Sequence, residues 1–183
     1  MAEVESMQSW IDAARHGDEQ GFLSIYRSYS KKVRGLLVQL LGPDHLDDNV
    51  QEVFLRVWKG LSSLREAQAL SSWIYRTTWN VAMDVRKRSA KQRAQFNQLI
   101  LEHTLAPSES KTEASFDAKI LVEKALASLD FEHRAVVVLV DLEELSIEDT
   151  AQMMNIPAGT VKSRLFNARK RLRQFLESKG VSL

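Results

Sequence analysis

Apolar side chains recur with a helical period along the first part of the chain. Over residues 18–41 they fall every three or four positions, as on the buried face of an amphipathic helix: Phe22, Ile25, Tyr26, Tyr29, Val33, Leu36, Leu37 and Leu40. We expect Asp18 to begin this helix and Gly42-Pro43 to end it, with a shorter helix before it in residues 1–17. Aromatic residues at such spacing are more often core than a ligand-binding set, so we assign them to the core.

A second apolar stripe lies in residues 44–60. Its members are Val50, Val53, Phe54 and Val57. Polar side chains stand on the other side of the predicted helix: Asp47, Asp48, Gln51, Glu52 and Arg56. By pattern alone, this outer side is a solvated acidic surface. Residues 61–70 follow as a short polar loop.

Residues 71–88 predict a helix in which Trp residues are interleaved with Arg, Asn and Lys. Ile74, Val81, Val85 and one of two threonines can face inward. The remaining positions carry Trp73, Arg76, Trp79, Asn80, Met83, Arg86, Lys87 and Arg88. Rings that stack on bases and cations that follow phosphates are what a single-stranded DNA surface requires. A core position for Trp73 is the alternative.

The helical period is lost over residues 89–115, where Pro107 and Ser108 belong to a stretch of linker composition. We therefore expect a first domain at residues 1–93, a flexible linker at 94–115 and a second domain at 116–183. Helices are expected at 116–129 and 131–142, with Asp130 as the N-cap of the second. The apolar run 136–140 also fits a buried strand, but its helical flanks favour a helix.

The C-terminal stretch, residues 146–172, predicts two short helices joined by a turn. Ser146 is suited to cap the first helix, and Asp149 follows three residues later as in a capping box. The apolar side of this helix is expected at Ile147, Ala151 and Met154. Asn155 tolerates the left-handed backbone of a turn.

The second helix of this pair follows Pro157, which suits a first helical turn. Val161 and Leu165 occupy its inward positions, which leaves these residues outward: Thr160, Lys162, Ser163, Arg164, Asn167 and Arg169. The arrangement is typical of a helix-turn-helix whose second helix enters the DNA major groove. A helical hairpin with a solvated basic face is the alternative reading of the same pattern.

Composition supports an all-α chain with separate surfaces. Only seven Gly and three Pro occur in 183 residues, and no alternating strand pattern accompanies them. The net charge is +1, but acidic residues gather in 117–149 and basic residues in the tail from Lys162. Such an asymmetry suggests one surface for nucleic acid and another for a different partner.

The sequence offers no support for catalysis. It has no cysteine, hence neither a disulfide framework nor a thiolate metal site. Its four His are scattered, and HExxH, nucleophile-elbow and phosphate-loop motifs are absent. We expect no enzyme activity, no catalytic residue, no metal and no cofactor. No long apolar run or signal-peptide core occurs, so a cytoplasmic protein without membrane insertion is expected.

Two stretches resemble the bacterial sigma factors. The wording T-A-x-x-x-x-I-P-x-G-T-V-K-S-R-L, which begins at Thr150, resembles their promoter-reading domain. The wording D-D-x-V-Q-E-V-F-L-R-V-W, which begins at Asp47, is similar to the helix that docks on core RNA polymerase. The short connector in place of a further domain identifies the chain as a member of the extracytoplasmic-function (ECF, group IV) class of the sigma-70 superfamily. The fold so implied is two small helical domains, the second a helix-turn-helix.

The resemblance implies a transcription initiation factor that binds core RNA polymerase. Contacts would be made with the clamp of the largest subunit, through Asp48, Gln51, Glu52 and Leu55, and with the flap of the second largest subunit. The minus-ten promoter element would be captured and melted by Ser62, Ser63, Arg65, Trp73, Arg76, Trp79, Asn80, Arg86, Lys87 and Arg88. The minus-thirty-five element would be read as duplex by Thr160, Lys162, Ser163, Arg164, Asn167, Arg169 and Arg171.

The resemblance also implies an anti-sigma factor as a partner, which would hold the chain at the inner membrane face where that factor is membrane-bound. At the position where housekeeping sigma factors carry two adjacent wedge aromatics, this chain has Trp73-Ile74, and we expect weaker melting from it. Two other functions stay open on sequence alone. One is a helix-turn-helix regulator that binds duplex DNA by itself, and the other is a protein-interaction module.

Overall fold

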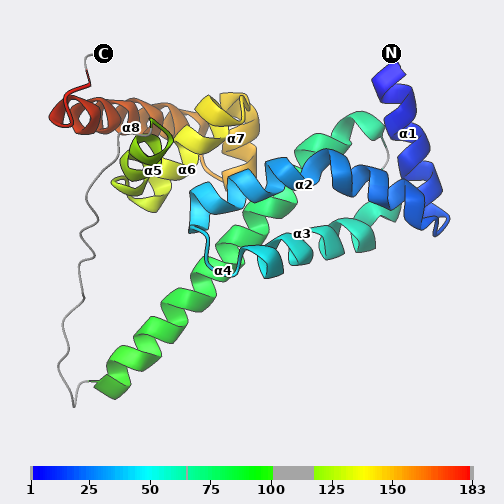
Figure 1. Ribbon diagram of the computed structural model, residues 1–183, viewed down its shortest axis with the longest axis horizontal. Coiled ribbons are helices and arrows are strands. Elements are labelled where there is room, and N and C mark those ends of the chain that lie inside the picture. The colour runs from blue at the N-terminus through cyan, green and yellow to red at the C-terminus, as the bar shows by residue number, and fades with distance from the viewer. Residues whose placement is uncertain (1, 65, 101–117, 182–183) are drawn as a thin grey trace. The chain divides into compact units, whose positions relative to one another are not determined.

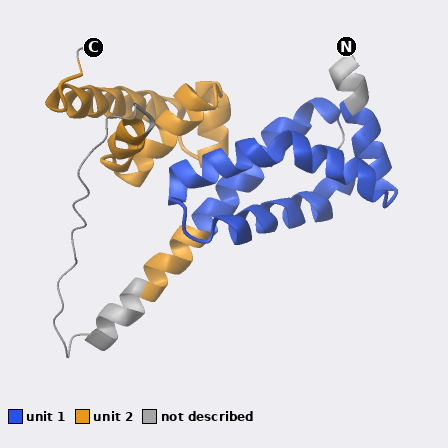
Figure 2. Cartoon of the chain, viewed as in Figure 1, with its two compact units in different colours: residues 1–84 blue, residues 85–183 orange. Residues whose placement is uncertain are grey.

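The computed structural model describes residues 2–64, 66–100 and 118–181, and every regular element in these residues is helical (Figure 1). The expected all-α class is confirmed. Two compact units, residues 1–84 and 85–183, make up the chain, and the boundary falls inside helix α4 (Leu70–Ile100), where the colour changes in Figure 2. Arg65 and the part of the expected linker beyond residue 100 lie outside the described residues.

The first unit contains α1 (Ala2–Arg15), α2 (Glu19–Leu41), α3 (Leu46–Gly60) and the beginning of α4. The carboxylate of Asp18 accepts a hydrogen bond from the backbone N–H of Gln20 at 2.8 Å, and Gly42 ends α2 with a φ of 87°. Both ends of α2 lie where the sequence predicts them, because capping depends on neighbouring residues only.

Each helix of this unit buries one apolar stripe. The stripe predicted for α3 is confirmed, since Val50, Val53, Phe54 and Val57 are at most 4% exposed. Most of the α2 stripe is buried as well, but Phe22 and Tyr26 are only half-buried. At Gly21 the helices α1 and α2 approach so closely that a Cβ atom would lie 2.7 Å from the carbonyl oxygen of Trp10.

The segment between α3 and α4 forms two 3₁₀ turns, η1 (Leu61–Ser63) and η2 (Ala67–Ala69), where the sequence predicted a short polar loop. Its apolar residues Leu61, Leu64 and Ala67 are buried and anchor the segment. Helix α4 then continues to Ile100, past the expected end of the first domain at Arg93. Residues 89–100 contain neither Gly nor Pro, so nothing local ends the helix.

The second unit contains α5 (Ala118–Ala127), α6 (Phe131–Val137), the single π-helical turn η3 (Val138–Leu142), α7 (Ile147–Met154) and α8 (Ala158–Ser178). The apolar run 136–140 is therefore helical, as favoured over a strand, and its residues 136–139 are buried. A π turn at the end of α6 is not predictable from the sequence, because it depends on how this buried run packs.

The helix-turn-helix is formed by α7 and α8. The hydroxyl of Ser146 accepts a hydrogen bond from the N–H of Asp149 at 2.9 Å, and Asn155 is left-handed with φ 54°, both as predicted. The buried side of α7 differs by a small rotation: Thr150, Ala151 and Met153 are buried, whereas Ile147 and Met154 are half-buried. Pro157 is the N-cap of α8 and not its first helical residue.

Asp130 fastens α6 to its surroundings in the second unit. As expected for an N-cap, its carboxylate accepts a hydrogen bond from the N–H of His133, at 3.1 Å. The ring nitrogen Nδ1 of His133 and Nη1 of Arg171 in α8 both lie 2.8 Å from carboxylate oxygens. The side-chain bond to His133, with its backbone N–H and Arg171 in support, lowers the pKa of Asp130 to about 2.

Replacement of Gly21 by Ala should destabilise the first unit. The new methyl group would meet backbone atoms of α1, and overpacking of this kind costs about 1–3 kcal/mol. Gly35→Ala in the same helix is the control: no atom lies within 4 Å of a Cβ there, so a gain of up to about 1 kcal/mol is expected. Urea unfolding followed by tryptophan fluorescence measures this unit alone, because all four Trp lie in it.

Removal of the imidazole in His133→Ala should raise the pKa of Asp130 toward its usual 3.8, and Arg171→Ala should raise it less. A carboxyl with a lowered pKa contributes stability at pH values above 3.8, and this contribution is lost as the pH falls through about 2. The Asp130 carboxyl group should therefore still be ionised at pH 3 in the unaltered protein. An NMR titration that follows the chemical shift of its carboxyl carbon measures this. A midpoint near 3.8 in that protein would contradict the assignment.

Candidate protein and nucleic-acid surfaces

The four residues predicted to bind polymerase share one side of α3. Asp48, Gln51, Glu52 and Leu55 follow the spacing i, i+3, i+4, i+7, which places them along a single helical ridge. Gln51 is exposed, and Leu55 remains 44% exposed although it is apolar. Because Val53 and Val57 are buried on the opposite side, the rotation of α3 is fixed and this ridge stays outward.

An apolar groove lies beside this ridge and was not anticipated. It is lined by residues of α2 and α3: Phe22, Tyr26, Arg34, Asp47, Val50, Gln51, Phe54, Leu55 and Trp58. The rings of Phe22 and Trp58 meet edge-on with centroids 4.8 Å apart, and the Tyr26 and Phe54 centroids are 4.6 Å apart. The sequence held one indication, since Trp58 is three residues after Leu55 and so falls near the same side of α3.

Arg56 connects this side of α3 to α4 within the first unit. Its Nε donates to Glu52 at 2.7 Å and its Nη1 to Asp84 at 2.8 Å. These two carboxylates raise the pKa of the Arg56 guanidinium, and the hydrogen bond to Asp84 has the larger effect. Glu52 is thereby held in one orientation at the edge of the ridge, although the pair is too exposed to add much stability.

The predicted minus-ten residues lie in the turns before α4 and along α4 itself. Ser62 and Ser63 are exposed, and the hydroxyl of Ser63 donates to the carbonyl oxygen of Gly60 at 2.6 Å. Arg65 is outside the described residues. The indole of Trp73 packs over Gly60, so closely that a Cβ atom there would lie 2.6 Å from the ring. Trp73 is thus half-buried: its ring packs on Gly60, and part of its surface remains accessible.

Four of the α4 residues form one ridge. Trp73, Arg76, Asn80 and Lys87 are spaced by three, four and seven positions, and the last three are exposed. Trp79 is on a different side of the helix and is only 5% exposed, so it belongs to the core in this structure. Ile74, expected beside Trp73 in the wedge position, is buried too and is not accessible to DNA.

The remaining α4 residues, Arg86 and Arg88, are also exposed. Arg86 is in the part of α4 that belongs to the second unit, where its Nη1 donates to Glu132 at 3.0 Å. Its guanidinium carbon lies 4.0 Å from the ring centroid of Phe131, within reach of a cation–π interaction. Arg86 therefore differs from Arg76 and Lys87, because it is tied to α6.

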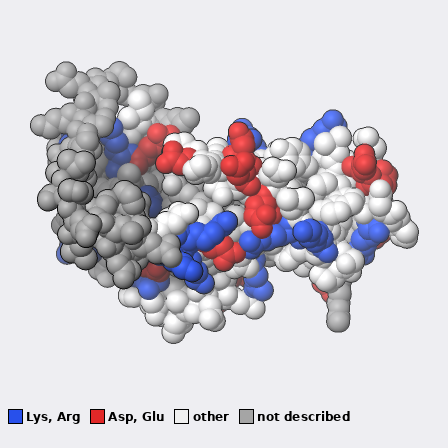
Figure 3. Space-filling model, turned by 90° about the horizontal axis from the view of Figure 1, so that it is seen from below, with Lys and Arg blue, Asp and Glu red and all other residues white. Residues whose placement is uncertain are grey.

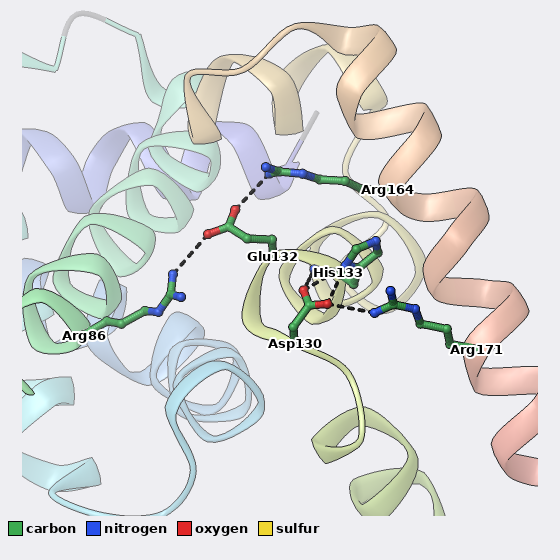
Figure 4. Close-up of polar contacts among 6 residues, drawn as sticks. All are labelled: Arg86, Asp130, Glu132, His133, Arg164 and Arg171. Atoms are coloured by element: carbon green, nitrogen blue, oxygen red, sulfur yellow. Dashed lines mark hydrogen bonds and ion pairs between the residues drawn. The ribbon is translucent and has the colours of Figure 1, made fainter. Parts of the chain in front are cut away.

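Basic and acidic side chains lie next to one another on the face seen in Figure 3. Three of the four arginines of α8 are paired with carboxylates of the same unit. Arg164 donates to Glu132 at 2.8 Å, Arg171 to Asp130 at 2.8 Å, and Arg169 holds Asp141 through two bonds of 2.5 and 3.0 Å (Figure 4 shows the first two). Asp141 raises the pKa of Arg169.

The outward side of α8 carries the other predicted minus-thirty-five residues. Val161, Leu165 and Ala168 are buried, the first two as predicted, and this fixes the rotation of the helix. Lys162, Ser163 and Asn167 are exposed, while Thr160 is half-buried and its carbonyl oxygen accepts from the Ser163 hydroxyl at 3.0 Å. Phe166, which is not among the predicted outward residues, is 71% exposed between them.

Other kinds of site have little support in the described part of the chain. No group of three or more His, Cys, Asp or Glu side chains there is arranged to hold a metal ion. No described helix has both the length and the apolar character that crossing a bilayer requires.

Comparisons with known proteins match both units. The Sigma-70 region 2 family matches residues 25–92, and the Sigma-70 region 4 family matches residues 119–172. These ranges include the α3 ridge, the α4 ridge, α7 and most of α8.

Curated relatives extend over most of the chain. The ECF RNA polymerase sigma factor SigM of Mycobacterium tuberculosis is 35% identical, over 87% of this chain and 79% of its own length. The ECF RNA polymerase sigma-E factor of Haemophilus influenzae is 29% identical, over 93% and 95% respectively. SigW of Bacillus subtilis is 27% identical, over 91% and 94%.

Solved structures share the fold. CnrH in complex with the cytosolic domain of CnrY aligns with a TM-score of 0.66 at 19% identity, over 94% of this chain and 98% of that one. RpoE of Bartonella quintana, in complex with the anti-sigma factor NepR, aligns with a TM-score of 0.62 at 22% identity, over 85% and 96%. Together with the family matches, the relatives show that this chain belongs to the ECF sigma factors of the sigma-70 family, which are promoter-directing transcription initiation factors and not enzymes.

Proposed function

We propose that this chain binds core RNA polymerase with α3 and reads the two promoter elements with α4 and α8. The observation that carries the proposal is common to the three helices. Each helix buries an apolar stripe, and its outward side carries residues suited to one partner. On α3 this side has Leu55 among polar groups, and on α4 it has Trp73 with Asn80 and Lys87. On α8 it has exposed polar and basic residues.

Core polymerase is the partner we assign to the α3 ridge. Asp48, Gln51 and Glu52 provide charged and amide groups that set register and orientation, while Leu55 provides an apolar contact in their midst. The groove beside Leu55 enlarges the apolar area available to the clamp of the largest subunit. Contact of the second domain with the flap of the second largest subunit remains a prediction from the family resemblance.

The minus-ten element is the ligand we assign to the turns before α4 and to its ridge. Trp73 offers a ring for stacking, Asn80 an amide for a base edge, and Arg76 and Lys87 charge for phosphates. Ser62, Ser63, Arg65, Arg86 and Arg88 stay in the proposed surface as predicted from the resemblance. Trp79 is left out of it, because a buried ring cannot stack on a base.

The minus-thirty-five element is the ligand we assign to α8. Ser163 and Asn167 face outward with Thr160 beside them, so we assign base contacts to this group. Lys162 is exposed next to them, and we assign it a phosphate contact. Arg164, Arg169 and Arg171 lie at the two flanks of the helix, bound to carboxylates. There they orient α8. Exchange of an exposed carboxylate partner for a DNA phosphate costs little free energy, because ion pairs on the surface are weak.

Domain roles and further partners follow from the same assignments. Residues 1–93 act as the polymerase-binding and minus-ten domain, residues 116–183 as the minus-thirty-five domain, and residues 94–115 as their linker. An anti-sigma factor is a further partner, since the related RpoE is solved in complex with one. The protein works in the bacterial cytoplasm, held at the inner membrane face where that factor is membrane-bound.

Reconstitution with core RNA polymerase tests the proposal as a whole. The chain should co-elute with the core enzyme, and the complex should give run-off transcripts from promoters selected out of a random library. Binding to duplex DNA without the core enzyme, and no transcript with it, would instead identify a conventional regulator. If the chain neither binds duplex DNA nor supports transcription, a protein-interaction module is the remaining function.

Leu55→Ala should weaken binding of the core enzyme by about tenfold, as loss of an apolar anchor at the centre of an interface does. Gln51→Ala should have a smaller effect in the same direction. Gln20→Ala, at an exposed glutamine of α2 away from the ridge, is the control and should bind as the unaltered chain does. Fluorescence anisotropy of the labelled chain, titrated with core enzyme, gives the three dissociation constants. Equal affinities for Leu55→Ala and the control would contradict the α3 assignment.

Lys162→Ala should weaken promoter binding by the holoenzyme for all sequences alike and lower the salt slope. Loss of one phosphate contact reduces the slope of log K against log salt by about 1. Lys179→Ala is the matched control: this exposed lysine follows the end of α8 and lies 5.8 Å from the ring centroid of Phe175. Filter binding at several salt concentrations measures both slopes, and identical slopes would exclude Lys162 from the phosphate contacts.

A further inference from the structure

Asp84 is the only acidic residue of α4, and it lies on the ridge that we assign to the minus-ten element. It follows Asn80 by four residues and precedes Lys87 by three, so it shares their side of the helix. Its side chain is 44% exposed. A carboxylate among residues that bind a DNA strand repels the phosphates of that strand unless a cation compensates its charge.

Arg56 is the cation that α3 supplies to Asp84. Its Nη1 donates to Oδ2 of Asp84 at 2.8 Å, and its Nε donates to Oε1 of Glu52 at 2.7 Å. Because two different nitrogen atoms make these bonds, one guanidinium holds both carboxylates at the same time. A guanidinium stays charged at any physiological pH, so the compensation of Asp84 does not depend on pH in that range.

Glu52 gives the Arg56 side chain its direction. The two residues are four positions apart on α3, a spacing at which side chains meet on the surface of a helix. An arginine without such a local partner samples many rotamers, whereas the bond to Glu52 directs the guanidinium toward α4. The three side chains are 37% to 44% exposed, so their bonds add little to folding stability. Their main effect is on where the charges lie.

We propose that Arg56 is a positioning residue for minus-ten recognition: oriented by Glu52, it compensates the charge of Asp84 and removes a repulsion from the strand-binding ridge of α4. This inference rests on the proposed function of α4 and adds a residue that lies on another helix and does not touch DNA. It also gives α3 a part in promoter binding besides its contact with polymerase.

The test uses holoenzyme reconstituted from the full chain and core RNA polymerase. Its ligand is a labelled single strand that carries the minus-ten element of a promoter selected from a random library. Arg56→Gln should weaken binding of this strand by about fivefold at low salt, the repulsion between two unit charges about 4 Å apart in water. The difference from the unaltered chain should shrink as salt is added. Arg56→Lys keeps the charge but lacks the fork that holds two carboxylates, so it should lose less affinity.

Asp84→Asn distinguishes charge compensation from other roles of Arg56. Added to Arg56→Gln, it should restore the affinity for the strand, because the acid that needed compensation is gone. If Arg56 instead contacts the strand directly, the double variant should bind as weakly as Arg56→Gln. If Arg56 contacts polymerase, Arg56→Gln should lower the affinity for core enzyme and leave the strand affinity of the assembled holoenzyme unchanged. Either of these two results would overturn the inference while the proposed function stands.

Arg27→Gln is the matched control, because it removes one positive charge from the exposed surface of α2, and it should bind the strand as the unaltered chain does. Urea unfolding followed by tryptophan fluorescence should give similar midpoints for all variants, since ion pairs of this exposure add little stability. A much lower midpoint for Arg56→Gln that Asp84→Asn does not restore would overturn the inference and identify a structural role. If holoenzyme with the unaltered chain does not bind the strand, both the inference and the proposed role of α4 are overturned.

Discussion

Burial of one apolar stripe per helix is the constraint on which the surfaces of this protein depend. A helix that must place Val50, Val53, Phe54 and Val57 in a core has no freedom to rotate about its axis. Its opposite side is then fixed outward, whatever residues it carries. The same holds for α8, where Val161, Leu165 and Ala168 are buried. The outward side chains thus acquire their direction from residues that are buried in the core.

Ion pairs divide the basic residues of α8 into those bound to carboxylates and those on the outward side. Arg164, Arg171 and Arg169 pair with carboxylates of α6, of its N-cap and of η3 respectively, whereas Lys162 lies on the outward side. Since exposed ion pairs contribute little to stability, these contacts matter more for where the guanidinium groups point than for the free energy of folding. A count of basic residues along the helix therefore overestimates the number on its outward side, and this outward group also includes the exposed ring of Phe166.

Aromatic residues in the first unit divide in a comparable way. Trp79 is buried, Trp73 is half-buried against Gly60, and Trp58 borders a groove with Phe22 and Leu55. Each ring lies on an amphipathic helix, so composition gives no means of telling a core ring from an accessible one. The groove in particular exists because α2 and α3 leave Phe22 and Tyr26 incompletely covered, and this depends on the contact between two helices.

The sequence by itself determined the features that arise from neighbouring residues. The all-α class, the caps Asp18, Asp130 and Ser146, the left-handed Asn155 and the buried stripes of α3 and α8 follow from spacing and from local hydrogen bonds. Tertiary structure decided the π turn η3, the extent of α4, the burial of Trp79 and the partners of the α8 arginines. Those arginines pair with residues 28 to 41 positions away, and a pattern read within one helix has no information on contacts at that separation.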